Sequence, residues 1–159
     1  MTWSAVTTVD PGPYGGIGQV RLATSPTTGS FTAVWNPSAN PQMVRTSTTV
    51  DDSGTTWLPP QTLPGADKDS SVPEIVIDNS GVMTVVWGNH ITPGYEHLRA
   101  SRSSNGVSWA PDVRVTPNVA AYSHTPISVA VNTAGVVMVA QSRGYSCCTS
   151  PTRLEVTRY

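Results

Sequence analysis

The stretch that decides the fold is Phe31-Thr-Ala-Val-Trp35, which recurs 52 residues later as Met83-Thr-Val-Val-Trp87. A glycine stands two residues before each copy, and a third glycine, Gly135, introduces another apolar run after a further 54 residues. Three tryptophans keep nearly the same spacing along the chain: Trp3, Trp57 and Trp109. Because self-similarity at a fixed spacing indicates a repeat architecture, the sequence predicts three copies of one unit, at approximately residues 3–56, 57–108 and 109–159.

Within each unit, the apolar residues favour short strands. Runs rich in β-branched residues are separated by Gly, Pro, Asn and Ser, and no window shows a sustained helical stripe. Examples of these runs are Ile75–Ile77, Val82–Trp87, Leu98–Ser101 and Val113–Val115. The 14 prolines and 13 glycines would also interrupt long helices. We therefore expect an all-β protein of four-stranded antiparallel units, which is typical of a β-propeller; a β-sandwich of the same strands is the alternative.

A turn motif precedes the second of the spaced tryptophans. In Asp52-Ser-Gly54-Thr-Thr56-Trp57, the carboxylate can accept backbone N–H groups of the turn that it begins, and glycine supplies a positive φ. A shorter version, Ser103-Ser-Asn105-Gly106-Val-Ser108-Trp109, follows in the next unit, where the Asn can cap in the same way. In each copy the tryptophan is expected to pack a large ring between neighbouring sheets.

These residues resemble the Asp-box (BNR) repeat of the sialidase-like β-propellers. The sequence departs from the family pattern in two places, since Val50 stands where the family prefers Ser and Asn105 replaces the Asp. The resemblance implies blades of a six-bladed propeller, so the whole chain, residues 1–159, would be a single half-propeller of three blades. In that family the Asp-boxes mark structural turns and are not catalytic.

The two ends of the chain correspond to parts of one unit. The segment Leu154–Tyr159 aligns with a predicted third strand at Leu98–Ser103, and Thr2–Thr8 aligns with a predicted fourth strand at Trp57–Leu63. We expect a C2 homodimer that closes one six-bladed ring, in which each N-terminal strand completes the partner's last blade. A nine-bladed trimer and a fragment cut from a longer chain are the alternatives.

The composition argues against several classes of protein. The net charge of −1 offers no basis for nucleic-acid binding, and no apolar stretch approaches the 18 residues of a transmembrane helix. The first residues, Met1–Ser4, do not begin a signal peptide. Cys147 and Cys148 are adjacent, which leaves a vicinal disulfide, free thiols or pairing across chains. Because no Cys or His spacing matches a metal site, we expect neither a metal nor a cofactor.

The candidate binding residues lie in the loops between units and between the second and third strands of a unit. The resemblance implies that these loops form the face that holds the active site in the sialidase family, opposite the Asp-boxes. Aromatic rings there could stack on sugar rings while amides and charged groups bond hydroxyls; the alternative is that the loops are ordinary polar surface. The candidate glycan-binding residues are Tyr14, Asp67, Lys68, Asn89, His90, Tyr122, His124 and Arg143.

An enzymatic role can be weighed against what a sialidase needs. The resemblance would imply three arginines on a substrate carboxylate, a Tyr nucleophile activated by a Glu, and an Asp acid/base. The Arg-Ile-Pro motif that carries the first arginine of the family is absent, and Arg21, Glu74 and Tyr122 are the best candidates for a catalytic set. Twofold symmetry suits repeated binding sites better than one asymmetric active site. We therefore expect a lectin-like or scaffold propeller, with a sialidase-like glycoside hydrolase, intact or degenerate, as the alternative.

Overall fold

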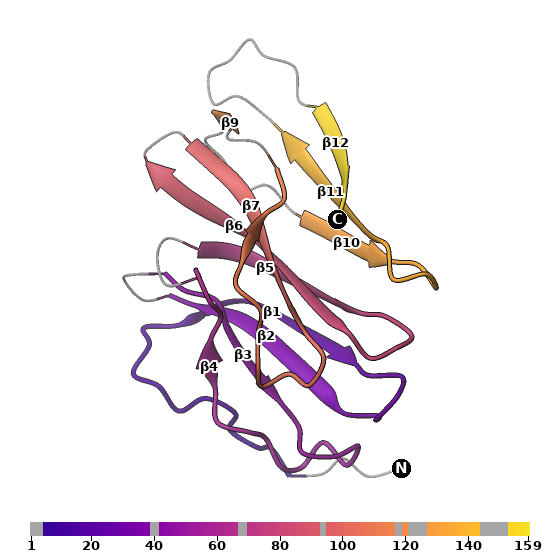
Figure 1. Cartoon of the computed structure of the whole chain (residues 1–159). Helices are drawn as coiled ribbons and strands as arrows, with labels where there is room; N and C mark the ends of the chain where they lie inside the picture. The colour runs from indigo at the N-terminus through magenta and orange to yellow at the C-terminus, as the bar shows by residue number, and fades with distance from the viewer. Residues whose placement is uncertain are drawn as a thin grey trace.

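A computed structural model describes residues 5–38, 42–66, 70–92, 95–116, 119–120, 127–143 and 153–159. In these residues the chain forms three antiparallel sheets and no helix, which confirms the predicted all-β class. The sheets are stacked side by side, with the first and third at opposite ends of the stack, so the described part of one chain does not close a ring (Figure 1). None of the described residues belongs to a helix long and apolar enough to cross a membrane.

Each sheet follows the order of its strands along the chain. The first sheet contains β1 (Ile17–Thr24), β2 (Phe31–Pro37), β3 (Arg45–Thr48) and β4 (Gln61–Thr62). The second contains β5 (Ser70–Ile77), β6 (Met83–Thr92), β7 (Tyr95–Ser103) and β8 (Val113–Arg114), with β9 (Val119–Ala120) also paired to β7. The third contains β10 (Ile127–Val131), β11 (Val137–Arg143) and β12 (Arg153–Arg158). The strands β1, β5 and β10 lie side by side and are called the inner strands below (Figure 1).

The hairpin that joins the first two strands of each sheet is closed by local hydrogen bonds. Gly29, Gly81 and Gly135 have φ of 72°, 84° and 75°, a left-handed conformation that glycine adopts without a steric penalty. The Asp78 Oδ1 atom accepts the N–H groups of Ser80 and Val82, at 2.9 and 3.0 Å. In the third sheet Asn132 Oδ1 accepts the N–H groups of Ala134 and Val136 in the same way, at 3.0 Å each. The glycines were expected from the sequence, whereas the caps at Asp78 and Asn132 were not predicted.

The turn before Trp57 differs from the prediction in one residue. Its capping carboxylate is that of Asp51, which accepts the Ser53 N–H at 2.9 Å, whereas the sequence led us to expect Asp52. Asp52 instead packs its Cβ against the backbone of Gly29, where an added Cβ would lie 2.7 Å away. The first two residues of this turn are both Asp, so the motif alone could not tell which side chain would turn inward.

The turn before Trp109 has the expected capping residue. Asn105 Oδ1 accepts the N–H groups of Val107 and Ser108 at 2.9 and 2.8 Å, and Trp109 Nε1 donates to the Gly106 carbonyl at 3.3 Å. Gly54 and Gly106 have φ of 70° and 71°, as their turns require. Trp57 pairs with Thr49 in an isolated antiparallel β-bridge, and Thr56 is the residue immediately before Trp57.

Apolar side chains from alternating strand positions form two separate cores, one on each side of the second sheet. One core packs Val34, Val44 and Leu63 of the first sheet and its following link against Ile75, Val85 and Trp87 of the second. The other core packs Val86, Leu98 and Ala100 of the second sheet against Ile127, Val137 and Val139 of the third. The second sheet is therefore buried on both faces, which explains why β6 reads as a nearly continuous apolar run at Met83–Trp87.

The described segment before β1 is not part of any sheet in the single chain. Residues 5–16 form no strand, and residues 5–8 are exposed, so the described part of the predicted strand Thr2–Thr8 is unpaired in the single chain. Trp3 lies outside the described residues. The third sheet contains three strands in its described part, with β12 at its edge.

Candidate functional site

The inner strands bring together two of the three residues that the sequence suggested for catalysis. Arg21 on β1 donates from Nε to Glu74 Oε1 on β5 at 2.7 Å, across 53 residues of sequence. Their cross-strand partners occupy matching places in the two sheets, because Arg21 lies opposite Val34 and Glu74 lies opposite Val86. The corresponding position on β10 is Ser128, opposite Ala140, and it is exposed. The three inner strands thus present a cation, an anion and a hydroxyl in one row.

The ion pair is held in a partly exposed setting. The Arg21 side chain is 40% exposed and that of Glu74 is 17% exposed. Arg21 also donates from Nη1 to the carbonyl of Val20 at 3.1 Å, which fixes the orientation of the guanidinium. A guanidinium carries five N–H donors, so donors remain beyond these two bonds for a sugar hydroxyl or carboxylate. The two opposite charges offset each other, and Oε1 of the carboxylate accepts from Arg21.

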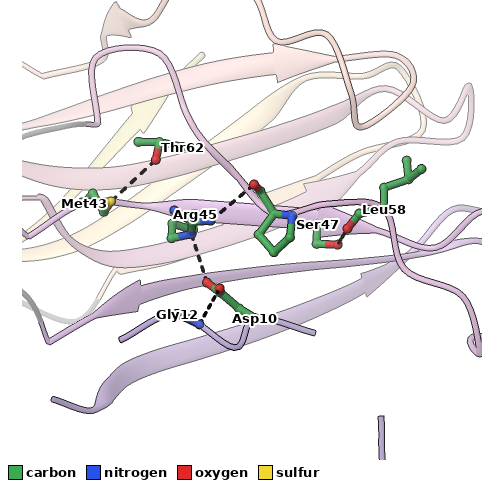
Figure 2. Close-up of polar contacts among 8 residues, drawn as sticks. Asp10, Gly12, Met43, Arg45, Ser47, Leu58 and Thr62 are labelled. Carbon is green, nitrogen blue, oxygen red and sulfur yellow. Dashed lines mark hydrogen bonds and ion pairs between the residues drawn. The ribbon is translucent and has the colours of Figure 1, made fainter. Parts of the chain in front are cut away.

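A second cluster anchors the loop that contains Tyr14 (Figure 2). Arg45 Nε lies 3.0 Å from Asp10 Oδ2, and Arg45 Nη2 donates to the carbonyl of Pro60 at 3.3 Å. Asp10 in turn accepts the N–H of Gly12 through Oδ1 at 3.2 Å. The guanidinium carbon of Arg45 is 5.7 Å from the centre of the Tyr14 ring, within the range of a cation–π contact. Both partners of the ion pair are largely buried, with side-chain exposures of 18% and 8%, so the cluster fixes this loop against β3.

The second sheet carries an arginine at the same register. Arg45 lies opposite Trp35 and Arg99 lies opposite Trp87. Arg99 forms an ion pair with Asp112, and its Nε donates to His97 Nε2 at 2.9 Å. The acidic partner of each arginine was not predicted from the sequence. Their spacing of 54 residues, equal to the repeat, is the signal that could have marked them as a repeated feature.

His97 acts as a neutral hydrogen-bond acceptor at this place. The pKa of His97 is lowered from 6.5 to about 4, mainly by burial of the imidazole and to a smaller extent by the nearby charges of Arg99 and Arg114. Its side chain is buried, and its Nε2 lone pair is used by Arg99. A histidine that stays neutral and accepts from a guanidinium is suited to positioning that guanidinium and is not free to serve as a general base. Among the residues that the structure describes, no group of three or more His, Cys, Asp or Glu side chains could hold a metal ion.

The remaining predicted binding residues are not gathered into one described site. Asn89 lies on β6 opposite Ser70, at the end of the sheet from which β5 begins. His90 and Arg143 lie near the ends of β6 and β11, and only their backbone is described. Four further predicted binding residues lie outside the described residues: Asp67, Lys68, Tyr122 and His124. The part of the site that the structure describes therefore consists of the Arg21–Glu74 pair on the inner strands and the Tyr14 loop anchored by Arg45.

A comparison with solved structures relates the fold of this chain to that of a sialidase. The structure is similar to that of the Hadza microbial sialidase Hz136, with a TM-score of 0.61 and 15% sequence identity. The similarity covers 82% of this chain and 33% of that one, so the chain spans about a third of the length of the sialidase it matches. At this identity the likeness establishes a sialidase-like fold. No protein-family model matches the sequence, and a comparison with curated proteins finds no match.

Proposed function

We propose that this chain is a non-catalytic, glycan-binding module of the β-propeller type, in which each sheet is one blade. The observation that carries the proposal is the ion pair between Arg21 and Glu74. In a sialidase-like enzyme these two groups would be needed separately, the arginine for the substrate carboxylate and the carboxylate to activate a tyrosine. Here each neutralises the other at 2.7 Å, which favours binding over turnover.

The described residues supply the groups that sugar binding uses. Arg21 keeps N–H donors on β1 in a side chain that is 40% exposed, and the exposed residue Ser128 adds a hydroxyl on β10, on the other side of β5. Tyr14 belongs to a loop held in place by buried charges, so an aromatic platform there would lose little conformational entropy on binding. The proposed ligand-binding set is completed by the loop residues named from the sequence, of which Asp67, Lys68, Tyr122 and His124 supply charge, a second aromatic ring and an imidazole.

The turns before Trp57 and Trp109 belong to the same proposal as structural Asp-boxes. They lie at the ends of β3 and β7, whereas Tyr14 precedes β1 and Asn89 approaches the end of β6. The antiparallel order places these two groups at opposite ends of the sheets. A binding face at the Tyr14 end would then leave the Asp-box turns free for their structural role.

A sialidase-like glycoside hydrolase is the second candidate. The sialidase-like fold and the presence of Arg21 and Glu74 on inner strands favour it. Catalysis would require the pair to open, so that Glu74 could accept a proton while Arg21 bound a substrate carboxylate. This requirement makes the two candidates separable by experiment.

The test combines a glycan array with hydrolysis of a 4-methylumbelliferyl sialoside. We expect saturable binding to a subset of glycans and no release of 4-methylumbelliferone. Binding should weaken at least tenfold on Arg21→Ala and on Tyr14→Ala, while Ser104→Ala, an exposed residue of the turn before Trp109, should bind as the wild type does. If the wild type releases the fluorophore and Glu74→Gln abolishes this release, the chain is a hydrolase and the proposed non-catalytic role is wrong. A wild-type chain that binds no glycan and releases no fluorophore would refute both and leave a scaffold.

A further inference from the structure

The two ends of the stack expose apolar side chains that a folded domain normally buries. On the outer face of the first sheet, Ile17, Val20 and Leu22 are 46%, 53% and 60% exposed. On the outer face of the third sheet, Met138, Leu154 and Val156 are 41%, 76% and 56% exposed. Within each set, residues that lie opposite or alternate along a strand share one side of the sheet, so each set is one continuous face.

The second sheet shows what normally covers these positions. Leu98 and Ala100 hold the register places of Leu154 and Val156, because Ala100 lies opposite Val86 as Val156 lies opposite Ala140. Both are almost completely buried, at 3% and 0% exposure, beneath the third sheet. On its other side, Ile75 corresponds to Leu22 and is 8% exposed beneath the first sheet. Within the chain, therefore, the sheet face that corresponds to the outer face of the third sheet packs against the face of the next sheet that corresponds to the outer face of the first sheet.

We propose that the outer face of the third sheet binds the outer face of the first sheet in a second copy of this chain. The first sheet offers a hollow of about 290 Å³ on that face as well as apolar chemistry. The lining residues are Val9, Asp10, Ile17, Val20, Ala33 and Trp35. Leu154 and Val156 project from the opposite end of the stack and are the side chains suited to enter such a hollow.

An open strand edge supports the same partner. The strand β12 pairs with β11 on one side and forms the edge of the third sheet among the described residues, whereas β3 and β7 in the other two sheets each pair with a further strand. Residues 5–8 form no strand, and Val6 is 99% exposed. In the proposed contact, this segment of the second copy pairs with β12 as a fourth strand, an addition that satisfies exposed backbone groups on both sides.

The contact joins unlike faces, so its geometry determines how copies assemble. Each chain carries one face of each kind, and a head-to-tail contact of this type closes into a ring when the rotation per copy allows it. Two copies would form a C2 ring with two identical contacts, and the second copy's inner strands would complete the wall around Arg21, Glu74 and Ser128. The contact rests on apolar faces and a strand edge, so it can be tested without a glycan.

The test is the mass of the 159-residue protein by light scattering over a dilution series. We expect twice the 16.8 kDa mass of the chain, and a mass of one chain on Leu22→Asp or on Leu154→Asp. Both residues are exposed in the single chain, so we expect the variants to fold. A circular dichroism spectrum that matches the wild type checks this. Val50→Asp, an equally exposed apolar residue in the turn between β3 and β4, is the matched control and should keep the wild-type mass. A wild-type mass of one chain at every concentration, or a Leu154→Asp variant that keeps twice that mass, would overturn the proposal.

Mixing the two variants separates a head-to-tail contact from a symmetric one. Leu22→Asp keeps an intact third-sheet face and Leu154→Asp keeps an intact first-sheet face, so an equimolar mixture should recover a mass of two chains through one intact contact. A contact between two first-sheet faces would instead leave Leu154→Asp dimeric by itself. Hydrogen exchange adds a readout of the added strand: the amides of residues 5–8 should be protected in the wild type and should exchange freely in Leu154→Asp.

Discussion

Acidification from pH 7.5 to pH 5.0 is expected to destabilise the protein through His97. Burial and the charges of Arg99 and Arg114 lower the pKa of His97 from 6.5 to about 4 in the folded protein. Below pH 6.5 the unfolded chain therefore binds a proton at this residue while the folded chain does not. Stability must fall as the pH decreases from 6.5 toward 4, because the unfolded state gains the proton first.

The size of the effect follows from the two pKa values. For one group titrating at 6.5 in the unfolded state and about 4 in the folded state, linkage predicts a loss of about 2 kcal/mol of unfolding free energy between pH 7.5 and pH 5.0. Most carboxylates stay ionised over this range, so histidines are the main titrating side chains within it, and a matched variant assigns the effect to His97. The measurement is urea denaturation at several pH values within it, with the unfolding free energy extrapolated to water.

The matched variant is His97→Gln, whose side-chain oxygen can still accept from Arg99 but does not titrate. We expect its unfolding free energy to be nearly flat over the same window, although its absolute stability can differ from that of the wild type. An NMR titration of His97 gives a second, direct readout. If the wild type and His97→Gln lose the same stability between pH 7.5 and pH 5.0, or if His97 titrates near 6.5 in the folded protein, the argument from burial and charge is wrong.

Two further predictions concern the turns. Gly81→Ala places a Cβ 2.5 Å from Thr27 Oγ1 at a φ of 84°, so it should lower the unfolding free energy by about 1–2 kcal/mol. The control Gly15→Ala, whose added Cβ would have its nearest neighbour 3.6 Å away, should change the unfolding free energy by less than about 0.5 kcal/mol. Urea denaturation of the two variants measures both values. Asp51→Ala should lower the thermal midpoint more than Asp52→Ala, because only the Asp51 carboxylate accepts the Ser53 N–H. The hydrogen bonds from the Ser53 side chain and backbone lower the pKa of Asp51, so its contribution should be present above pH 3.8 and be lost as the pH falls through the lower folded value. Equal midpoints for the two Asp variants would contradict this assignment.

The elements that depend on neighbours in the sequence were the predictable ones. The strands at Phe31–Trp35 and Met83–Trp87 follow from β-branched and aromatic residues that come after a glycine, and they appear as β2 and β6. The Asn105 cap was predictable because its bonds reach only two and three residues along the chain. Asp78 and Asn132 make the same kind of local bond, and attention to the residue three positions before each glycine would have found them.

The candidate site was less predictable because its contacts join distant segments. Arg21 and Glu74 were both singled out from the sequence, yet that they form an ion pair depends on β1 and β5 being neighbours in space. The same holds for Asp10 and Arg45, which are 35 residues apart and meet only because the segment before β1 folds back onto β3. The choice of Asp51 over Asp52 was also tertiary, since it depends on which side chain packs against Gly29 in another turn.

The sequence by itself determined the repeat, the all-β class and most of the turns, because spacing, β-branched residues and glycines act over a few bonds. Only the tertiary structure decided which strand positions are covered. Leu98 and Leu154 occupy the same place in their sheets, but the third sheet covers Leu98, whereas none of the described residues covers Leu154. Burial depends on which sheet lies next in space, and no local pattern contains that information.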